Sequence, residues 1–291
     1  MLNIENQLIS AEISLMGAEL MSLKTADGTQ YLWQGDPKYW AGRAPIMFPW
    51  VGRLLGGQHR CGDKLYELGI HGFARKQMFT CTAQSETAVT LTLEANEETK
   101  AQYPYDFRLS VTYALEGSSL GITFRVENLG SRTMPFAWGG HPGFNVPLAA
   151  GETMADYEVE FAQQCRPDRV VFSRTNVLVD GFKPFPLEEG RKLQLSHDLF
   201  DEDAIFLANA AKSVTMRGRK SGRSVTLTYP DMNYLGLWHA PKTDAPYVCI
   251  EPWSSLPGRE GVVEDFSCRS DLLHAAPGET KQTTWTIQLG N

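Results

Sequence analysis

The sequence lacks the residue patterns of the common cofactor and metal sites. Its five cysteines are widely spaced and form no CxxC pair, so neither a zinc ribbon nor a thioredoxin-type dithiol is expected. HxH, HExxH and HxxxH patterns are missing, and so are the GxGxxG and P-loop sequences that bind nucleotides. The sequence therefore predicts no metal and no cofactor, and unpaired thiols indicate a reducing cytosol.

An excess of basic residues and long apolar runs are also missing. The net charge is −7 and the isoelectric point is about 5.4, which argues against nucleic acid or an anionic membrane as a partner. No stretch approaches the roughly 20 apolar residues of a membrane helix, and residues 1–10 lack the pattern of a signal peptide. We therefore expect a cytoplasmic protein that is a monomer or a homodimer.

Short segments in which apolar and polar residues alternate occupy most of the chain, whereas helical periodicity is scarce. Two pairs of these segments are separated by short polar links and predict antiparallel hairpins. Residues 96–103 could form one or two helical turns, and residues 163–186 are expected to be irregular but packed chain. The predicted strands are Ala88–Glu94, Phe107–Leu115, Leu120–Glu127, Ser213–Arg217, Ser224–Tyr229 and Thr283–Leu289.

The order of these elements excludes some fold classes. A parallel doubly wound sheet requires strands that alternate with helices, and no such rhythm is present. Many short strands with turns between them favour a sandwich or a barrel. We therefore predict one all-β domain over residues 1–291, built from two large and mostly antiparallel sheets packed face to face.

Two histidines lie in glycine-rich, aromatic segments. His141 lies in Trp138–Phe144, after a predicted strand, and His71 lies in Ile70–Arg75. Histidine moves protons near neutral pH, and glycines let the backbone approach a bound molecule closely. A single histidine more often caps a loop, but the glycines, proline and aromatics around His141 favour function. For His71 the structural and functional interpretations are equally supported.

A carboxylate lies in a third aromatic segment, Cys249–Trp253. Glu251 follows a predicted apolar strand, Tyr247–Ile250, and its neighbours are isoleucine, proline and tryptophan. Burying a carboxylate is costly unless it is paired or solvated, and an apolar environment raises its pKa. An ion pair with an arginine is the structural alternative, but we predict a role in proton transfer.

Two arginines bracket a fourth segment, Arg43–Arg53, which carries two prolines, a phenylalanine and a tryptophan. The planar guanidinium group suits hydroxyl pairs, carboxylates and phosphates. We predict substrate binding for Arg53, whereas for Arg43 a surface salt bridge is equally well supported. The remaining histidines are interpreted as structural: His59 and His197 at the surface, and His274 in a turn. His239 follows a predicted strand and could approach a site, but a structural role is favoured.

The four segments together resemble those of the aldose 1-epimerase (galactose mutarotase) superfamily. The similarity is greater to the branch that includes the LacX-like proteins and the hexose-6-phosphate mutarotases. Each motif alone is weak, but the four occur in the family's order and span most of the chain. The motifs are Phe48-Pro49-Trp50-Val51-Gly52-Arg53, His71-Gly72-Phe73-Ala74-Arg75, Gly140-His141-Pro142-Gly143-Phe144-Asn145 and Ile250-Glu251-Pro252-Trp253.

The resemblance implies a β-supersandwich fold and an acid–base reaction on a sugar ring. It gives His141 the role of the general acid, which protonates the ring oxygen O5. Glu251 matches the general base, which takes the proton of the anomeric hydroxyl O1. His71 and Arg53 match residues that bind sugar oxygens and help to polarise O5. Such proton transfers open and close a cyclic hemiacetal without a metal or cofactor.

Further substrate contacts are implied by the same resemblance. The family's hydroxyl-binding aspartate matches Asp203, with Asp201 as the nearby alternative. Arg75, together with Lys76 and Arg43, could bind the phosphate of a sugar phosphate. The aromatic residues that could flank the apolar face of the sugar, although as a group they more often form a core, are Trp50, Trp253, Phe73 and Trp138.

Alternatives to a free-aldose mutarotase follow from these motifs. A free aldose is slightly favoured over a sugar phosphate, because the LacX-like proteins share the Phe-Ala-Arg tail and it does not settle their substrate. A sugar-binding sandwich without catalysis is disfavoured, since both proton-transfer residues are present. A glycoside hydrolase ranks last, because it needs two facing carboxylates and only Glu251 lies in a convincing site.

Overall fold

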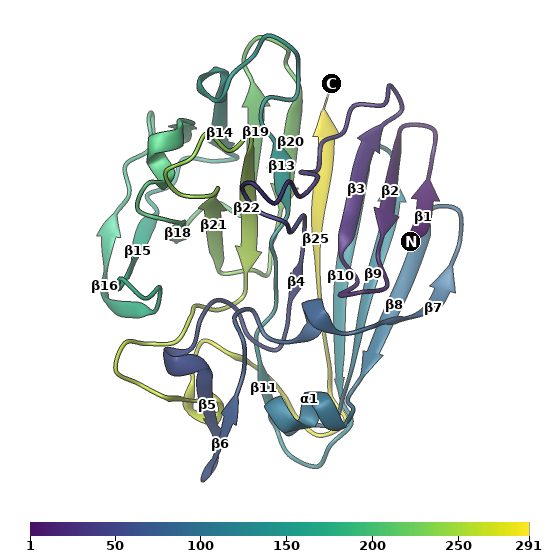
Figure 1. Ribbon diagram of the computed structural model, residues 1–291, viewed down its shortest axis with the longest axis vertical. Helices are drawn as coiled ribbons and strands as arrows, with labels where there is room; N and C mark the ends of the chain where they lie inside the picture. Colours follow the sequence, from purple (N-terminus) through teal and green to yellow (C-terminus); the bar gives the residue numbers. More distant parts are fainter. Residues whose placement is uncertain (291) are drawn as a thin grey trace.

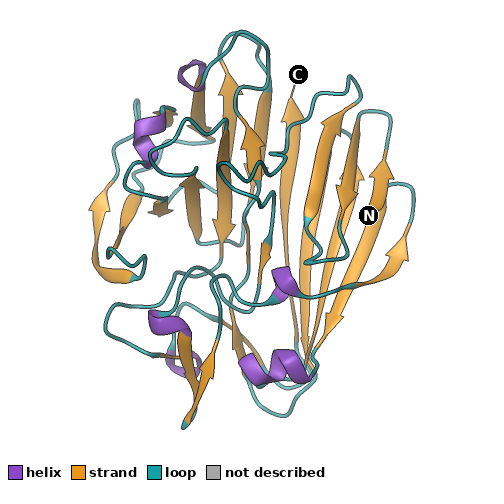
Figure 2. Ribbon diagram, viewed as in Figure 1, coloured by secondary structure: helices purple, strands orange, loops and turns teal. Residues whose placement is uncertain are grey.

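The computed structural model describes residues 1–290, and its regular structure is almost entirely β-strand (Figure 2). Within that range the strands form two large sheets and three small ones (Figure 1). Residues of both large sheets belong to one buried hydrophobic core, which includes Val214 and Leu227 from one sheet and Leu207 and Leu235 from the other. The predicted all-β fold with two large, mostly antiparallel sheets is confirmed.

The larger sheet contains nine strands of the described chain, and each is antiparallel to its neighbours. Both predicted hairpins are confirmed, β9 with β10 and β19 with β20, and buried residues alternate along β9 and β10. In spatial order the strands are β17 (Lys192–Gln194), β14 (Tyr157–Phe161), β19 (Ser213–Gly218), β20 (Ser224–Thr228), β25 (Thr280–Gly290), β10 (Ser119–Asn128), β9 (Phe107–Glu116), β8 (Ala88–Glu94) and β7 (Thr80–Gln84).

The second large sheet, with eight strands in residues 1–290, carries the segments singled out in the sequence. It packs closely on the first sheet, because a side chain at Gly140 would overlap the indole of Trp285 on β25. Its strands in order are β16 (Leu178–Pro184), β15 (Asp168–Phe172), β18 (Ile205–Ala208), β21 (Tyr234–Trp238), β22 (Tyr247–Trp253), β12 (Gly139–Gly140) and β4 (Ile46–Met47), with β13 (Gly143–Asn145) paired to β22.

The remaining elements are short. The one α-helix in the described range, α1 (Glu97–Gln102), lies within the predicted helical stretch and begins with a capping box between Asn96 and Thr99. No helix of residues 1–290 is long and apolar enough to cross a membrane. The small sheets contain β1 (Leu2–Glu5), β2 (Ile9–Ile13) and β3 (Leu20–Thr25); β11 (Met134–Phe136) and β24 (Leu273–Ala275); and β23 (Glu264–Asp265), β5 (Gln58–Cys61) and β6 (Lys64–Glu67). The 3₁₀ turns are Leu55–Gly57, Ala74–Lys76, Met154–Asp156, His197–Phe200 and Phe266–Cys268.

The expectation of irregular chain at residues 163–186 is wrong. Strands β15 and β16 form an antiparallel hairpin there, at the edge of the eight-stranded sheet. A β-bulge between Val170 and Phe172 shifts the register and breaks the period-two pattern that would have identified the strands. Pro184 is the last residue of β16 and therefore does not interrupt the pairing.

Two predicted surface histidines lie deeper than expected. His59 is fully buried, stacks on Phe266 and has Nε2 2.8 Å from the carbonyl oxygen of Gln102. His197 is half-buried, with Nδ1 3.2 Å from Nε2 of the buried His239. Polar neighbours suggested exposure, but on strand β5 they point to the face opposite His59, as exposed Arg60 does, whereas His197 lies in the 3₁₀ turn His197–Phe200.

Candidate active site

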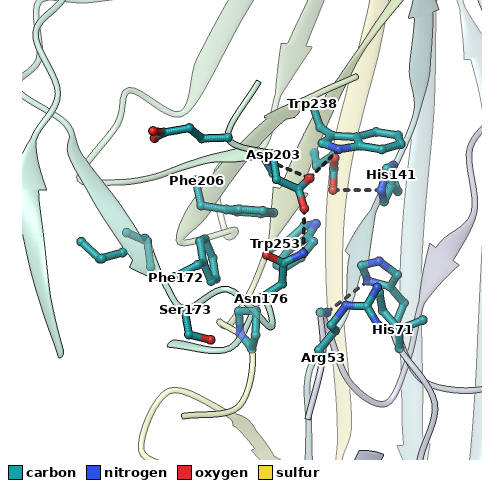
Figure 3. Close-up of a pocket in the computed structure, with 18 of the residues that line it drawn as sticks. Arg53, His71, His141, Phe172, Ser173, Asn176, Asp203, Phe206, Trp238 and Trp253 are labelled. Carbon is teal, nitrogen blue, oxygen red and sulfur yellow. Dashed lines mark hydrogen bonds and ion pairs between the residues drawn. The ribbon is translucent and has the colours of Figure 1, made fainter. Parts of the chain in front are cut away.

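A cavity of about 410 Å³ lies against the eight-stranded sheet. This volume is in the range of small-molecule sites. Figure 3 shows Asp203, Trp238 and His141 on one side of it and His71 with Arg53 below them, while Phe172 and Ser173 come from the opposite wall. Seven of the eight predicted catalytic and substrate-binding residues line the cavity: Arg53, His71, Arg75, His141, Asp203, Glu251 and Trp253.

His141 and Glu251 face each other at the cavity floor. Nε2 of His141 lies 3.4 Å from Oε2 of Glu251, and both side chains are almost fully buried. Glu251 lies inside β22 rather than beyond its end, where the sequence pattern had placed it. It pairs with Gly236 on β21, and because a glycine has no side chain this register leaves room for the ring of Phe206, which lies beside Gly236.

Burial favours the neutral form of both members of this pair. It raises the pKa of Glu251 well above its ordinary value, and the negative charge of Asp203 raises it further. Burial also lowers the pKa of His141 to about 3, and the nearby positive charge of Arg75 acts in the same direction. The indole of Trp40 covers the imidazole of His141, with ring centroids 4.9 Å apart.

His71 is held in one tautomer by the backbone. Its Nδ1 accepts a hydrogen bond of 3.1 Å from the N–H of Gly52, so the proton of the neutral ring lies on Nε2. The His71 N–H in turn donates to the carbonyl oxygen of Gly52 at 2.9 Å. Burial, and then the charges of His141, Arg75 and Arg53, lower the pKa of His71 well below its ordinary value. His71 is therefore a neutral hydrogen-bond donor.

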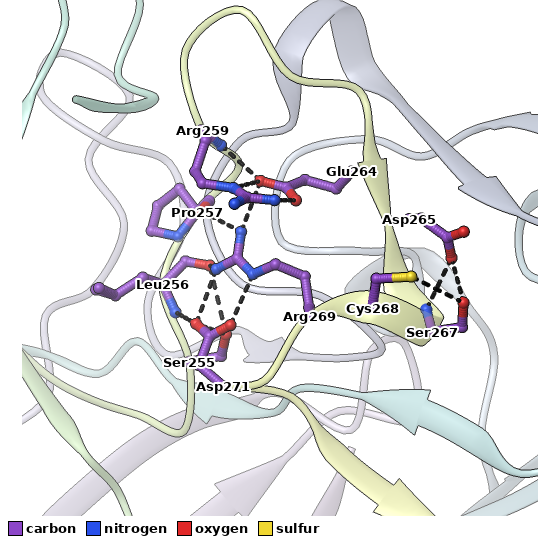
Figure 4. A network of polar contacts seen from close by, with 10 residues as sticks. All are labelled: Ser255, Leu256, Pro257, Arg259, Glu264, Asp265, Ser267, Cys268, Arg269 and Asp271. Atoms are coloured by element: carbon purple, nitrogen blue, oxygen red, sulfur yellow. Dashed lines mark hydrogen bonds and ion pairs between the residues drawn. The ribbon is translucent and has the colours of Figure 1, made fainter. Parts of the chain in front are cut away.

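A network of polar contacts holds the loop Ser255–Pro257 (Figure 4). The buried guanidinium of Arg269 donates to the carbonyl oxygens of Leu256 and Pro257, both at 3.1 Å, and binds Glu264 at 2.8 Å. A second contact joins it to Asp271 at 2.6 Å. The ring of Pro257 lies so close to Gly52 that a side chain there would overlap it. The network therefore fixes the loop that packs against Gly52, and the backbone of Gly52 holds His71.

Asp203, rather than Asp201, reaches the cavity. Its Oδ1 accepts a hydrogen bond of 2.8 Å from the indole N–H of Trp238, and its Oδ2 accepts one of 2.7 Å from Asn176. Asp201 is exposed and does not line the cavity. The backbone N–H of Ala204 also donates to Oδ1, at 2.9 Å, so Oδ2 is the oxygen that retains a lone pair for a further donor.

Of the three predicted phosphate ligands, Arg75 lines the cavity, whereas Arg43 and Lys76 lie outside it. Arg75 lines the cavity, and its Nε is buried with no hydrogen-bond partner within residues 1–290. Arg53 also lines it, exposed to solvent. Arg43 does not, because its guanidinium donates to the carbonyl oxygen of Met21 and to Gln34. Lys76 is exposed and is not part of the cavity lining either.

The prediction that Trp50 contacts the substrate is wrong. Trp50 is fully buried, stacks on Phe266 at 4.6 Å and lies under the guanidinium of Arg269. Trp253 does line the cavity and packs on Phe206, with ring centroids 4.2 Å apart. Phe73 and Trp138 belong to the core, as such aromatic groups usually do.

Several cavity residues were missed from the sequence. Trp40 and Trp238 cover His141 from two directions, with edge-to-face packing between the two indoles. Phe206 and Asn176 complete the wall around Asp203. A signal existed for Trp238, since it precedes His239 at the end of an apolar strand, but Trp40 and Asn176 lie in loops without a motif.

The fold and the site together define the galactose mutarotase-like class of β-sandwich. A galactose mutarotase-like protein from Lactobacillus casei superimposes with a TM-score of 0.94, at 34% identity and with both chains fully covered. A galactose mutarotase related enzyme from Lactobacillus acidophilus gives a TM-score of 0.93 at 33% identity, covering 100% of this chain and 97% of the other.

Comparison of sequences gives the same result. The family model for aldose 1-epimerase matches residues 1–285. The chromosomal protein LacX of Lactococcus lactis is 36% identical over 100% of this chain and 99% of its own length. A protein of Escherichia coli named "Putative glucose-6-phosphate 1-epimerase" is 27% identical over 63% of this chain and 59% of its own. The chain belongs to the aldose 1-epimerase family, as its motifs predicted.

Proposed function

We propose that the protein interconverts the α and β anomers of an aldohexose by acid–base opening and closure of the sugar ring. The observation that carries this proposal is the His141–Glu251 pair, whose Nε2 and Oε2 atoms lie 3.4 Å apart at the cavity floor. Membership of the aldose 1-epimerase family supports an isomerase that acts on sugars. The pair supplies an acid and a base side by side.

One exchangeable proton is shared by the pair. Because burial lowers the pKa of His141 and raises the pKa of Glu251, this proton lies on Glu251 in the free protein. Its transfer to Nε2 gives an imidazolium and a carboxylate without changing the net charge of the site. Sugar hydroxyls that donate hydrogen bonds to the carboxylate stabilise this ionised form.

During ring opening, His141 and Glu251 act on different oxygen atoms of the sugar. The imidazolium of His141 gives its proton to the ring oxygen O5, while the carboxylate of Glu251 takes the proton of the O1 hydroxyl. The C1–O5 bond breaks as a C1=O double bond forms, which leaves an open-chain aldehyde. Rotation about the C1–C2 bond and reversal of both proton transfers close the ring on its other face.

The surrounding residues orient the ring. His71 donates a hydrogen bond from Nε2 to a sugar oxygen, and its neutral state adds no charge to repel the imidazolium of His141. Arg53 binds oxygens at the open side of the cavity, and Asp203, held by Trp238 and Asn176, accepts hydrogen bonds from ring hydroxyls. Trp253 offers an apolar surface to the sugar face.

Optical rotation of freshly dissolved α-D-glucose and α-D-galactose tests this proposal. We expect the protein to accelerate the approach to anomeric equilibrium in a saturable manner for at least one of these sugars. Saturable binding of the sugar without any acceleration would contradict the proposal and would indicate a sugar-binding sandwich that does not catalyse the reaction.

Hexose 6-phosphates form a second substrate class that one observation favours. Arg53 and Arg75 both line the cavity, and within residues 1–290 neither guanidinium has an ion-pair partner. A phosphate beside them would form charge-assisted hydrogen bonds. The name of the Escherichia coli relative also refers to a sugar phosphate.

Arg75→Ala separates the two substrate classes. Loss of a hydrogen bond to a charged group costs about 1.5–3 kcal/mol, so KM for hexose 6-phosphates should rise about 10–150-fold if Arg75 binds phosphate. Exchange of free hexose anomers should change much less, as measured by NMR exchange between the anomers. Lys76→Ala is the matched control, because Lys76 is exposed outside the cavity. Equal losses on both substrate classes would contradict phosphate binding by Arg75.

A further inference from the structure

Cys249 lies beside the acid–base pair but has no part in the reaction scheme. It precedes Glu251 by two residues on β22, so both side chains project from the same face of the strand. The ligand atoms of His141, Cys249 and Glu251 all lie within 4.8 Å of one another, and the three residues are buried. Cys249 pairs with Gly143, and a side chain at Gly143 would contact the sulfur.

Two of these atoms already have the spacing of ligands in a metal site. Zinc binds thiolate, imidazole and carboxylate at about 2.0–2.3 Å in a tetrahedral arrangement, which places ligand atoms about 3.3–3.8 Å apart. Nε2 of His141 and Oε2 of Glu251 are already 3.4 Å apart. Apart from this contact with His141, Oε2 of Glu251 has no hydrogen-bond partner in the described chain, so ligation would give a buried oxygen a stronger partner.

We propose that His141, Cys249 and Glu251 form an inhibitory site for a thiophilic divalent cation such as Zn²⁺. The cation accepts electron pairs from Nε2, the Cys249 thiolate and a Glu251 carboxylate oxygen, and its fourth position faces the cavity. The thiol proton and the exchangeable proton of the pair leave to solvent. A doubly charged ion thus replaces two protons, and the net charge of the buried site does not change.

Inhibition follows because the ion occupies both proton carriers. With the lone pair of Nε2 and the carboxylate of Glu251 bound to metal, neither can exchange a proton with the sugar. This consequence rests on the proposed function, whereas binding of the ion does not. The thiolate also sets selectivity, since soft ligands favour zinc and cobalt over magnesium and calcium, which prefer oxygen ligands.

Cobalt(II) absorption tests binding without any substrate. Titration of the native protein with Co²⁺ should produce the near-ultraviolet band of a thiolate–cobalt bond and intense visible bands of four-coordinate cobalt, and Zn²⁺ should remove both. The bands should be lost in Cys249→Ala and retained in Cys268→Ala, which removes the exposed cysteine. Retention of the thiolate band in Cys249→Ala, or no band in the native protein, would overturn the proposal.

Zinc inhibition of anomer exchange gives the second measurement. Loss of a residue that only hydrogen-bonds to a metal ligand lowers metal affinity by about 10–100-fold. Loss of a ligand itself, in Cys249→Ala, should therefore raise the inhibition constant of Zn²⁺ by at least about tenfold. Circular dichroism checks that the alanine variant is folded. If it is not, Cys249→Ser, which is closer in size to the native residue, replaces it and should show a similar rise. An unchanged inhibition constant in a folded variant overturns the proposal. Cobalt bands in a protein without mutarotase activity would refute only the proposed function.

Discussion

At the scale of single residues, two aspartates of one segment have different surroundings. Asp203 receives hydrogen bonds from Trp238 and Asn176 at the cavity wall, whereas Asp201 is exposed and outside it. The donors fix the carboxylate without using all of its lone pairs. A hydroxyl of the sugar can therefore bind Asp203 in a defined orientation.

Asp203→Asn should weaken sugar binding, because it replaces a charged acceptor by a neutral amide. Loss of such a bond costs about 1.5–3 kcal/mol, which corresponds to a rise of about 10–150-fold in KM. Steady-state kinetics of anomer exchange measures it. Asp201→Asn is the matched control and should stay within about twofold of the native KM. Similar effects of both substitutions would show that Asp203 has no direct contact with the sugar.

The sequence allowed most single residues of the site to be predicted, but not their partners. His141, Glu251 and His71 stood out because titratable groups among glycines and aromatics are unusual, and all three line the cavity. Trp50 belongs to the same motif as Arg53, yet it faces the core, because the chain between them leaves the strand and turns at Gly52, which has a positive φ of 68°. Trp40 could not be identified, since its contact with His141 is made only by the fold.

At the scale of elements, the turn that carries His71 depends on glycine. His71 and Gly72 both have positive φ, of 63° and 71°, and a side chain at Gly72 would overlap the carbonyl group of Phe48. The backbone N–H of Phe73 and that of Ala74 donate to the same carbonyl oxygen. The turn is thus packed against the Phe48 segment too tightly for any other residue.

Gly72→Ala should lower the free energy of unfolding by at least about 2 kcal/mol, because it adds both backbone strain and a steric overlap. Urea denaturation measures the change. Gly69→Ala is the control three residues earlier, where φ is not positive and no atom lies near the added carbon. It should change the unfolding free energy by less than about 0.5 kcal/mol. Equal effects of the two substitutions would disprove the packing argument.

Strands were predictable where buried residues alternate without interruption. The predicted segment 88–94 coincides with β8, and β9 and β10 extend their predicted ranges by one or two residues. The β15–β16 hairpin was not predicted, because its bulge at Val170 and Phe172 disrupts the alternation. Pairing between distant strands, such as β22 with β12 and β13, is set by the packing of the whole sandwich.

At the scale of the whole molecule, the two large sheets share one hydrophobic core, and we propose that the chain unfolds as one domain. The Arg269 network should then contribute to global stability. Burial opposes ionisation of Glu264 and Asp271, but contacts with arginines outweigh it and hold the pKa of both carboxyls below their ordinary values. Their contribution is present above the ordinary carboxyl pKa and is lost as pH falls through the lowered values.

Arg269→Met should destabilise the protein by about 3–5 kcal/mol near neutral pH, because it removes the arginine partner of Asp271 and one of the two arginine partners of the buried Glu264. The difference from the native protein should shrink as the pH falls below about 4.5, where these carboxyls become protonated in the variant. Chemical denaturation at several pH values measures both curves. A difference that does not depend on pH would show that Arg269 acts only through packing against Trp50.

The most direct test of the account is the rate of anomer exchange in Glu251→Gln and His141→Asn. Because each substitution removes one proton carrier of the pair, kcat should fall by about 10²–10⁴-fold in each variant, as measured by NMR exchange on a sugar that the native protein turns over. The exposed controls Glu260→Gln and His274→Asn should retain the native rate. Folded Glu251→Gln and His141→Asn variants with native exchange rates would contradict the assignment of this pair as acid and base.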